Sequence, residues 1–147
     1  MFNKRFVAIF ACIVAIASCK KDAGVTDPVP KIISISLSSN NVQSLADSIV
    51  FTIKYQDGDG DLGENSADVK NLFVIDNRVP LTYPYRIQQL APDNSSVPIQ
   101  GTLKVVLKGI GITDSSALQN TTFSIYVVDR AGHHSTTVTS GTVVIHQ

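Results

Sequence analysis

The stretch SIVFTIKY, residues 48–55, carries an apolar or aromatic side chain at every second position. The members of this alternating set are Ile49, Phe51, Ile53 and Tyr55. The residues between them are mixed in character: Val50, Thr52 and Lys54. Because successive side chains of a β-strand point to opposite faces of the sheet, the apolar set shares one face. The stretch therefore predicts a strand with one buried face.

The same two-residue period recurs along the chain, interrupted by residues typical of turns. It is found in two further apolar sets, Leu103, Val105 and Leu107, and Phe123, Ile125 and Val127. We expect these faces to form the core. Seven strands are predicted, at residues 32–38, 48–55, 71–76, 85–90, 102–108, 122–129 and 136–146. One helical turn, capped by Asp114 or Ser115, is predicted within residues 112–120.

The composition of the chain favours strands over helices. Its 147 residues suit one domain with a substantial core. Val, Ile, Thr and Ser are abundant and Glu64 is the only glutamate, so the usual residues of surface helices are scarce. The formal net charge is zero, and no basic run follows the N-terminal segment. We expect an all-β protein that does not bind nucleic acid.

The last third of the chain resembles a known type of β domain. The stretch FSIYVVDRAGHHSTTVTSGTVVI, residues 123–145, is similar to the closing hairpin of bacterial immunoglobulin-like domains, in which a strand ends in Asp and a glycine turn leads to the final strand. This resemblance implies an immunoglobulin-like or fibronectin-like antiparallel β-sandwich of about seven strands. The chain lacks the Trp and the Cys pair of antibody domains, so only the architecture carries over. A jelly roll or a small barrel is the alternative fold.

The first residues of the chain have the pattern of a targeting segment. Lys4 and Arg5 precede the apolar run FVAIFACIVAIA, residues 6–17, which is short for a membrane-spanning helix of about 20 residues. The run ends in IASC, residues 16–19, which resembles the lipobox of bacterial lipoproteins. The resemblance implies cleavage before Cys19 and attachment of lipid to the Cys19 thiol. An ordinary secretory signal with a chance cysteine is the alternative.

This resemblance divides the chain into three parts. Residues 1–18 are expected to be a signal peptide, residues 19–30 a lipidated tether and residues 31–147 the folded domain. Cys12 leaves with the signal peptide, so the mature chain has no pair of cysteines for a disulfide. Lys20 stands where a retention Asp keeps enteric lipoproteins at the inner membrane. We therefore expect a lipid anchor in the outer membrane, with the leaflet left open.

The stretch YQDGDGDLGEN, residues 55–65, concentrates negative charge: Asp57, Asp59 and Asp61 stand at alternate positions between glycines. Like charges this close are unfavourable unless water or a cation screens them. The spacing resembles the D-x-D-x-D core of EF-hand, dockerin and thrombospondin type 3 calcium loops. In EF-hand register Asp68 takes the twelfth place, but Leu62 stands where that loop has glycine. The resemblance therefore implies a calcium loop of different geometry.

The sandwich architecture predicts which residues join this loop. The loop after the second predicted strand lies at the same end of a sandwich as the loop between the last two, so Asp129 is expected near Asp57. The loop with Asp93 and Asn94 is expected at this end too. All candidate donors are oxygen atoms, which favours Ca²⁺ bound by Asp57, Asp59, Asp61, Asp68 and Asp129.

Two other interpretations of these polar residues stay open. Asp and Gly are common in exposed turns, so the acidic loop is alternatively a solvated turn. His133 and His134 are potential zinc ligands, but adjacent residues of a strand point to opposite faces, and exposure in a tight turn explains them equally well.

The sequence contains no recognisable catalytic motif. The chain has no Trp, and its Ser, His and Asp residues match no nucleophile pattern. Tyr83, Tyr85 and Arg86 form either a contact patch for a ligand or a proline turn packed by its own tyrosines. We therefore expect a non-enzymatic, lipid-anchored cell-envelope protein with a structural or accessory role and a calcium-stabilised domain. A glycan- or protein-binding module at the cell surface is the alternative.

Overall fold

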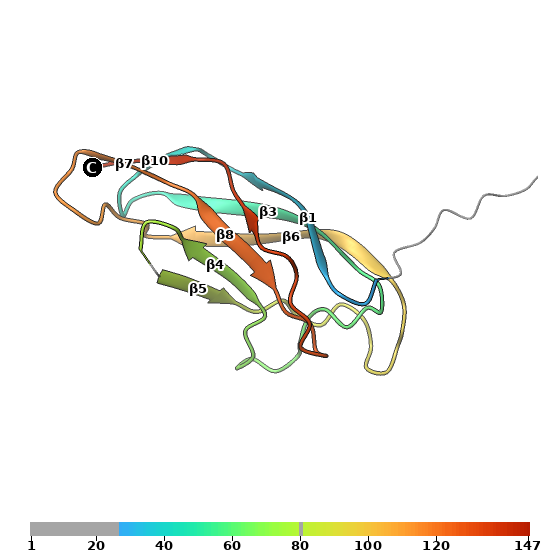
Figure 1. Ribbon diagram of the computed structural model, residues 1–147. Coiled ribbons are helices and arrows are strands. Elements are labelled where there is room, and N and C mark those ends of the chain that lie inside the picture. The colour runs from blue at the N-terminus through green and yellow to red at the C-terminus, as the bar shows by residue number, and fades with distance from the viewer. Residues whose placement is uncertain (1–26, 80) are drawn as a thin grey trace, which may run out of the picture.

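The computed structural model describes residues 27–79 and 81–147 (Figure 1). Residues in these ranges form strands and no helix, so the prediction of an all-β chain is confirmed. The strands of the described chain are β1 (Lys31–Leu37), β2 (Asn41–Gln43), β3 (Ser48–Asp57), β4 (Leu72–Asp76), β5 (Leu81–Tyr85), β6 (Ile99–Lys108), β7 (Leu118–Thr121), β8 (Phe123–Val127), β9 (Val138–Thr139) and β10 (Val143–His146). The predicted signal peptide and Cys19 lie outside the described residues, as does most of the predicted tether.

The strands pair into three sheets. One sheet has the order β1-β3-β6 and a second has the order β5-β4-β8-β9, both antiparallel. In the third, β10 lies between β7, which is antiparallel to it, and β2, which is parallel to it. In the described ranges, no helix is long and apolar enough to cross a bilayer.

The core lies between the β1-β3-β6 sheet and the sheet that contains β4 and β8. The predicted inward residues of two strands are completely buried: Ile49, Phe51, Ile53, Phe123, Ile125 and Val127. The rings of Phe51 and Phe123 meet edge to face, with centroids 5.2 Å apart and planes at 82°. Such a contact adds to the free energy of burial. The alternation of SIVFTIKY therefore predicted the buried face correctly.

One long predicted strand is divided in the structure. The strand predicted at residues 136–146 is split into β9 and β10. The reason is Ser140: its hydroxyl accepts a hydrogen bond from the Phe123 N–H at 2.9 Å, so a side chain replaces a carbonyl in the ladder. The strand predicted at residues 122–129 is β8, and the strand β7 that precedes it was not predicted.

Two local predictions were wrong. Residues 86–90 are not a strand, because the Asn71 side chain accepts from the Ile87 N–H at 2.6 Å and replaces a strand partner there; β5 ends at Tyr85. Residues 112–120 form no helical turn: the Asp114 carboxylate accepts from the N–H and hydroxyl of Ser116 at 2.8 and 2.5 Å, but the chain enters a strand at Leu118. This local turn leads into β7 instead. The short strand β2 was not predicted.

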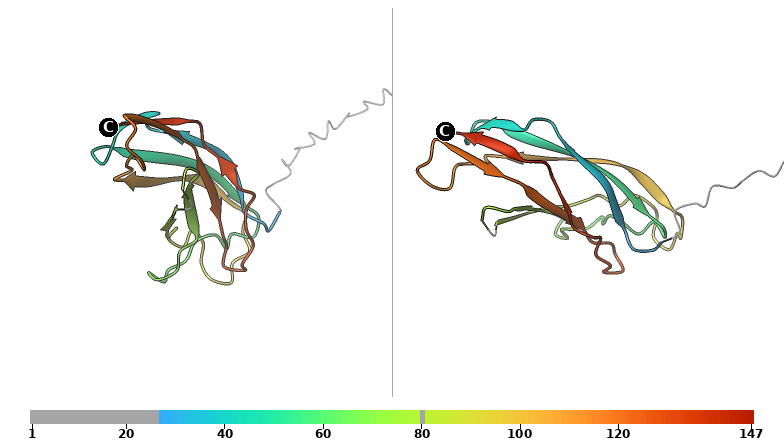
Figure 2. Two further views of the ribbon diagram at one scale, coloured as in Figure 1. Left: turned by 60° about the vertical axis from the view of Figure 1, so that its left-hand side comes forward. Right: turned by 45° about the horizontal axis from the view of Figure 1, so that its top comes forward.

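Three loops meet at one end of the domain. They follow β3, β5 and β8, and both views of Figure 2 show them away from the C-terminus. Backbone hydrogen bonds join them: Glu64 N–H donates to Ile87 O at 2.9 Å, and Arg130 N–H donates to Asp61 O at 3.3 Å. The predicted meeting of these loops is therefore confirmed.

Candidate metal centre

The acidic loop begins where β3 ends, at Asp57, and curls back on itself. The Leu62 N–H donates a hydrogen bond to Asp57 Oδ2 at 2.8 Å, which closes the curl. Gly60 and Gly63 have positive φ angles of 79° and 97°, which residues with a Cβ rarely adopt. Leu62, which occupies the glycine place of an EF-hand, is completely buried in the core. An apolar side chain thus anchors the loop, which explains the departure from the EF-hand pattern.

The loop after β5 covers one side of the acidic loop. A Cβ on Gly60 would lie 2.2 Å from the carbonyl oxygen of Val97, and one on Gly63 would lie 2.4 Å from that of Gln88. No real Cβ comes so close to a carbonyl oxygen, so both positions require glycine. The glycines between the carboxylates therefore permit a close approach of backbone as well as the curl.

The turn between β8 and β9 contacts the other side of the acidic loop. Asp61 Oδ2 accepts a hydrogen bond from the Ala131 N–H at 3.0 Å. The Arg130 guanidinium donates to the carbonyl of Gly63 at 2.8 Å. These bonds fix the direction of the Asp61 carboxylate from a segment about 70 residues further along the chain.

The three alternate carboxylates converge. Asp57, Asp59 and Asp61 each offer one oxygen, and these oxygens all lie within 4.8 Å of one another. The Oδ1 atoms of all three are buried and have no hydrogen-bond partner. Asp57 has an exposed fraction of 0 %. Buried carboxylate oxygens without partners are unfavourable by several kcal/mol in real proteins, so this arrangement calls for a positive charge at its centre.

The pKa values of Asp57 and Asp61 agree with a site that needs a positive charge. Burial raises the pKa of Asp57 to about 6; the Leu62 N–H opposes the rise, and the charges of Asp59 and Asp61 add to it. Burial likewise raises the pKa of Asp61, as do the charges of Asp129 and Asp59. No ion pair within residues 27–79 and 81–147 involves any of the three carboxylates. The protein itself therefore supplies little compensating charge.

The raised pKa predicts how the stability of the metal-free domain changes with pH. Between the usual value of 3.8 and about 6, folded Asp57 keeps a proton that the unfolded chain has lost. Stability therefore falls as pH rises through this window, and we expect a gain on acidification from pH 7 to pH 5. The gain should be of the order of 1 kcal/mol, because nearby water screens part of the interaction.

Thermal unfolding in a chelator at pH 7 and pH 5 measures this gain. The Asp57→Asn variant is the control, because it has no carboxylate to titrate at this position. The gain in free energy of unfolding should be larger in the unmodified chain than in the variant. Identical pH dependence of the two proteins would contradict the assignment of the raised pKa to Asp57.

The donor set suits a hard divalent cation. All three converging atoms are carboxylate oxygens, the ligands that Ca²⁺ and Mg²⁺ prefer. Ca²⁺ binds oxygen at about 2.3 to 2.6 Å, so two ligands of one ion lie at most about 5 Å apart. The spacing of the three oxygens meets this limit. A buried cluster that can hold a metal ion is thus present, and its geometry is compatible with calcium.

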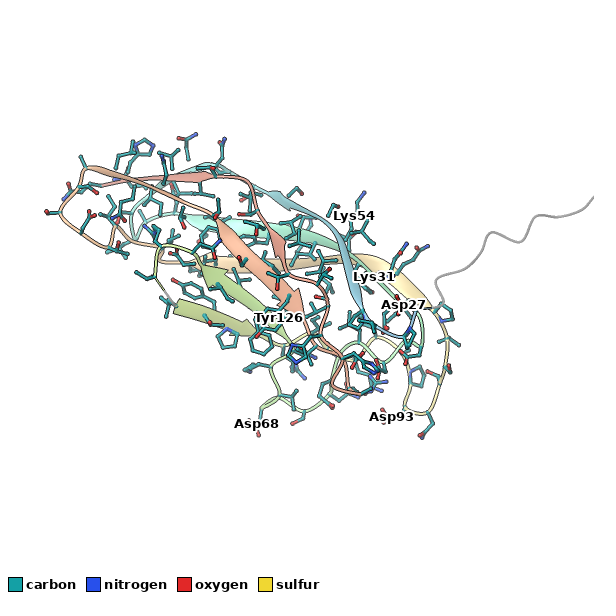
Figure 3. The ribbon with its side chains drawn as sticks, in the orientation of Figure 1. Asp27, Lys31, Lys54, Asp68, Asp93 and Tyr126 are labelled. Atoms are coloured by element: carbon teal, nitrogen blue, oxygen red, sulfur yellow. The ribbon has the colours of Figure 1, made fainter. Side chains whose placement is uncertain are left out.

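The other predicted ligands lie outside this group of three. Asp129 is buried close to Asp61, but Oδ1 accepts from the His133 N–H at 2.7 Å and Oδ2 lies 2.9 Å from His133 Nδ1. Asp68 is exposed, and Figure 3 shows it projecting from the outer part of the loop after β3. Asp93 projects from the loop after β5 in the same view.

The two histidines are engaged separately. His133 contacts Asp129, whereas the ring of His134 stacks on Tyr126 with centroids 5.7 Å apart. In the described part of the chain, neither histidine belongs to a group of three potential metal ligands.

The tyrosines of the LTYPY strand take part in packing. Tyr83 and Tyr85 are half-buried against the core, and the Tyr85 hydroxyl donates to Val106 O at 3.1 Å. Arg86 donates to the carbonyl of Asn65 at 2.8 Å, which holds the loop after β3. The two tyrosines are therefore packing residues, but the predicted proline turn is wrong, because Pro84 lies within β5 opposite Phe73 of β4.

Sequence reasoning missed two residues that position the loop. Arg130 was not distinguished from other exposed cations. Asn71 is buried and joins three segments: its side chain bonds to both backbone groups of Ile87, and its carbonyl accepts from the Val128 N–H at 2.9 Å. Neither the spacing nor the neighbours of Asn71 in the sequence signal this role.

Comparison with protein-family models, with curated proteins and with solved structures found no match.

Proposed function

We propose that this chain is a non-enzymatic cell-envelope protein whose domain is stabilised by Ca²⁺ bound to Asp57, Asp59 and Asp61. One observation carries the proposal: each of the three carboxylates has a buried Oδ1 without a hydrogen-bond partner and brings one oxygen within 4.8 Å of the others. A cation there removes the repulsion among the carboxylates and joins the loops that meet at this end. The role of the protein is structural or accessory.

Calcium suits the site better than the other common divalent ions. Zinc prefers sites with nitrogen or sulfur ligands, whereas the converging atoms here are carboxylate oxygens. Magnesium demands near-ideal octahedral geometry and gives up its waters reluctantly, whereas Ca²⁺ accepts irregular sets of oxygens. Asp129 contributes negative potential behind Asp61, and its own oxygens serve the turn between β8 and β9.

The strand order supports an immunoglobulin-like sandwich as the scaffold. The β1-β3-β6 sheet faces the β5-β4-β8-β9 sheet, and β10 follows β9 and pairs in parallel with β2. In this architecture the loops between strands cluster at the two ends of the domain. The cation site is then an end-loop site that ties together both sheets.

The titration of the domain with calcium tests the proposal. Among the described residues, the hydrophobic core cluster extends from Ile32 to Ile145, so a chain of residues 20–147 keeps this cluster. Extracellular calcium modules bind at about 10⁻⁴ to 10⁻³ M, so 10 mM Ca²⁺ should raise the free energy of unfolding by about 1.4 to 2.7 kcal/mol. Thermal and urea unfolding measure the increase, a chelator should reverse it, and Mg²⁺ should produce less.

Two double variants make this experiment specific. Asp59→Asn with Asp61→Asn should abolish the response to calcium while the metal-free fold stays as stable or gains stability, because like charges are removed. Asp68→Asn with Asp93→Asn removes the same charge from exposed positions at this end and should keep the response. Unchanged unfolding at 10 mM Ca²⁺ in the unmodified chain would mean that the acidic loop is only a turn.

The location in the envelope is tested at the predicted lipid anchor. The motif IASC supports lipid attachment at Cys19 and anchoring in the outer membrane. Cys19→Ser in the full-length chain should move the protein out of the membrane fraction, because serine cannot accept the lipid. Cys12→Ser is the matched control and should leave fractionation unchanged. A Cys19→Ser protein that stays in the membrane with its leader uncleaved would contradict lipid anchoring.

A further inference from the structure

The segment before β1, residues 27–30, packs directly on the acidic loop. The carbonyl of Asp27 accepts a hydrogen bond from the Gly58 N–H at 2.9 Å. A Cβ on Gly58 would lie 2.3, 2.6 and 2.7 Å from the O, C and N atoms of Asp27. Gly58 stands between Asp57 and Asp59, two members of the carboxylate group. The backbone of the segment therefore occupies the space beside the candidate cation site.

The segment has a defined shape of its own. Asp27 Oδ1 accepts from the Val29 N–H at 3.1 Å, and Asp27 Oδ2 lies 2.6 Å from Lys31 Nζ (Figure 3). Pro30 is buried, and β1 begins at the next residue. The segment is thus folded as a short turn whose single outward carbonyl bond goes to Gly58.

The hydrogen bond between Gly58 and Asp27 and the binding of a cation by Asp57 and Asp59 are expected to depend on each other. Without a cation, repulsion among the carboxylates favours loop conformations that separate Asp57 from Asp59. Gly58 lies between them, so such conformations would turn its N–H away from Asp27. A cation that holds both neighbours of Gly58 would keep the N–H directed at the Asp27 carbonyl, as in the structure.

We propose that residues 27–30 are a positioning segment for the cation site and that cation binding in turn docks this segment on the loop after β3. The inference rests on the proposed calcium function. Because binding free energies are linked, docking strengthens cation binding by the same factor by which the cation strengthens docking. The cation thereby sets the direction in which the chain enters β1.

A glycine substitution tests the segment without touching a carboxylate. The φ angle of Gly58 is not positive, so Gly58→Ala is compatible with the loop backbone, and the three atoms nearest to the added Cβ all belong to Asp27. Gly141→Ala is the matched control, because its Cβ meets no atom within 4 Å and its φ angle is not positive. In residues 20–147, calorimetric titration should show Ca²⁺ binding about tenfold weaker for Gly58→Ala and unchanged for Gly141→Ala.

A second variant and a second measurement complete the test. A chain of residues 31–147 lacks the segment and should show the same loss of affinity, even if Gly58→Ala perturbs folding. The NMR order parameter of the Val29 amide should be about 0.85 with Ca²⁺ and below about 0.6 with a chelator. Equal affinity in the unmodified and shortened chains, or a Val29 order parameter that ignores calcium, would overturn the inference and leave the calcium function intact. Absence of calcium binding in the unmodified chain would overturn the proposed function itself.

Discussion

Phe51→Ala is expected to lower the free energy of unfolding by about 3 to 5 kcal/mol, and Phe123→Ala by a similar amount. Both side chains are completely buried, and their rings contact each other edge to face across the two sheets. Each substitution removes apolar surface from the core and leaves a cavity that the surrounding strands cannot fill. Urea unfolding of residues 20–147 at neutral pH measures the loss.

Two substitutions on the opposite faces of the same strands are the controls. Thr52 and Ser124 are half-buried and alternate with the core residues of β3 and β8. Thr52→Ala and Ser124→Ala should each change the free energy of unfolding by less than about 1 kcal/mol. Similar losses for the core and control substitutions would mean that the register is displaced by one residue, because such a slip exchanges the two faces of a strand.

Arg78→Ala is expected to cost about 3 to 5 kcal/mol, because it leaves the Asp76 carboxylate buried without its cation. The side chains of Arg78 and Asp76 are 11 % and 2 % exposed, and Nη2 lies 2.6 Å from Oδ2. Arg78 also donates to Gln119 at 2.7 Å, and the Thr121 hydroxyl donates to Asp76 Oδ1 at 2.7 Å. The substitution therefore breaks a network, and denaturant unfolding should show the loss.

The acid side of the stability profile distinguishes this network from simple packing. Burial by itself raises the pKa of Asp76, but the hydrogen bonds from Arg78 and Thr121 outweigh burial, so the pKa lies below 3.8. The stability contributed by Asp76 is therefore present above pH 3.8 and is lost as pH falls through the folded pKa. The Arg78→Ala variant should not show this loss of stability at acidic pH. Arg86→Ala, at an exposed arginine that bonds only backbone carbonyls, should cost less than about 1 kcal/mol.

The parts of the fold that sequence predicted share a strong local signal. β3, β6 and β8 repeat apolar residues at every second position over five or more residues, and their inward faces are those predicted. The errors arose where a side chain competes with the backbone ladder, as Ser140 does between β9 and β10 and Asn71 does beyond β5. β2 has three residues and too few alternations to signal a strand.

In the candidate site too, the residues with a local sequence pattern were predicted and those with only long-range contacts were not. Asp57, Asp59 and Asp61 were predicted because their spacing is local, and the structure brings these three together. Asp68 follows the spacing of a helical calcium loop, but the buried Leu62 turns this loop another way, and Asp68 stays outside the group. Gly58 and Asn71 act through segments far away in sequence, and such contacts have no local pattern.

The pairing of β1 with β3 has a mechanical consequence. β1 starts beside the loop end, and its ladder with β3 runs from Lys31 opposite Gln56 to Leu37 opposite Phe51. The described chain begins at Asp27 and ends at Gln147 on the far side of the domain (Figure 1). A force applied between these two points acts along β1 in shear, so the hydrogen bonds of the ladder bear the force together instead of opening one after another. Under tension, the domain should therefore yield at its slow global unfolding rate and not by peeling of β1 from the sheet.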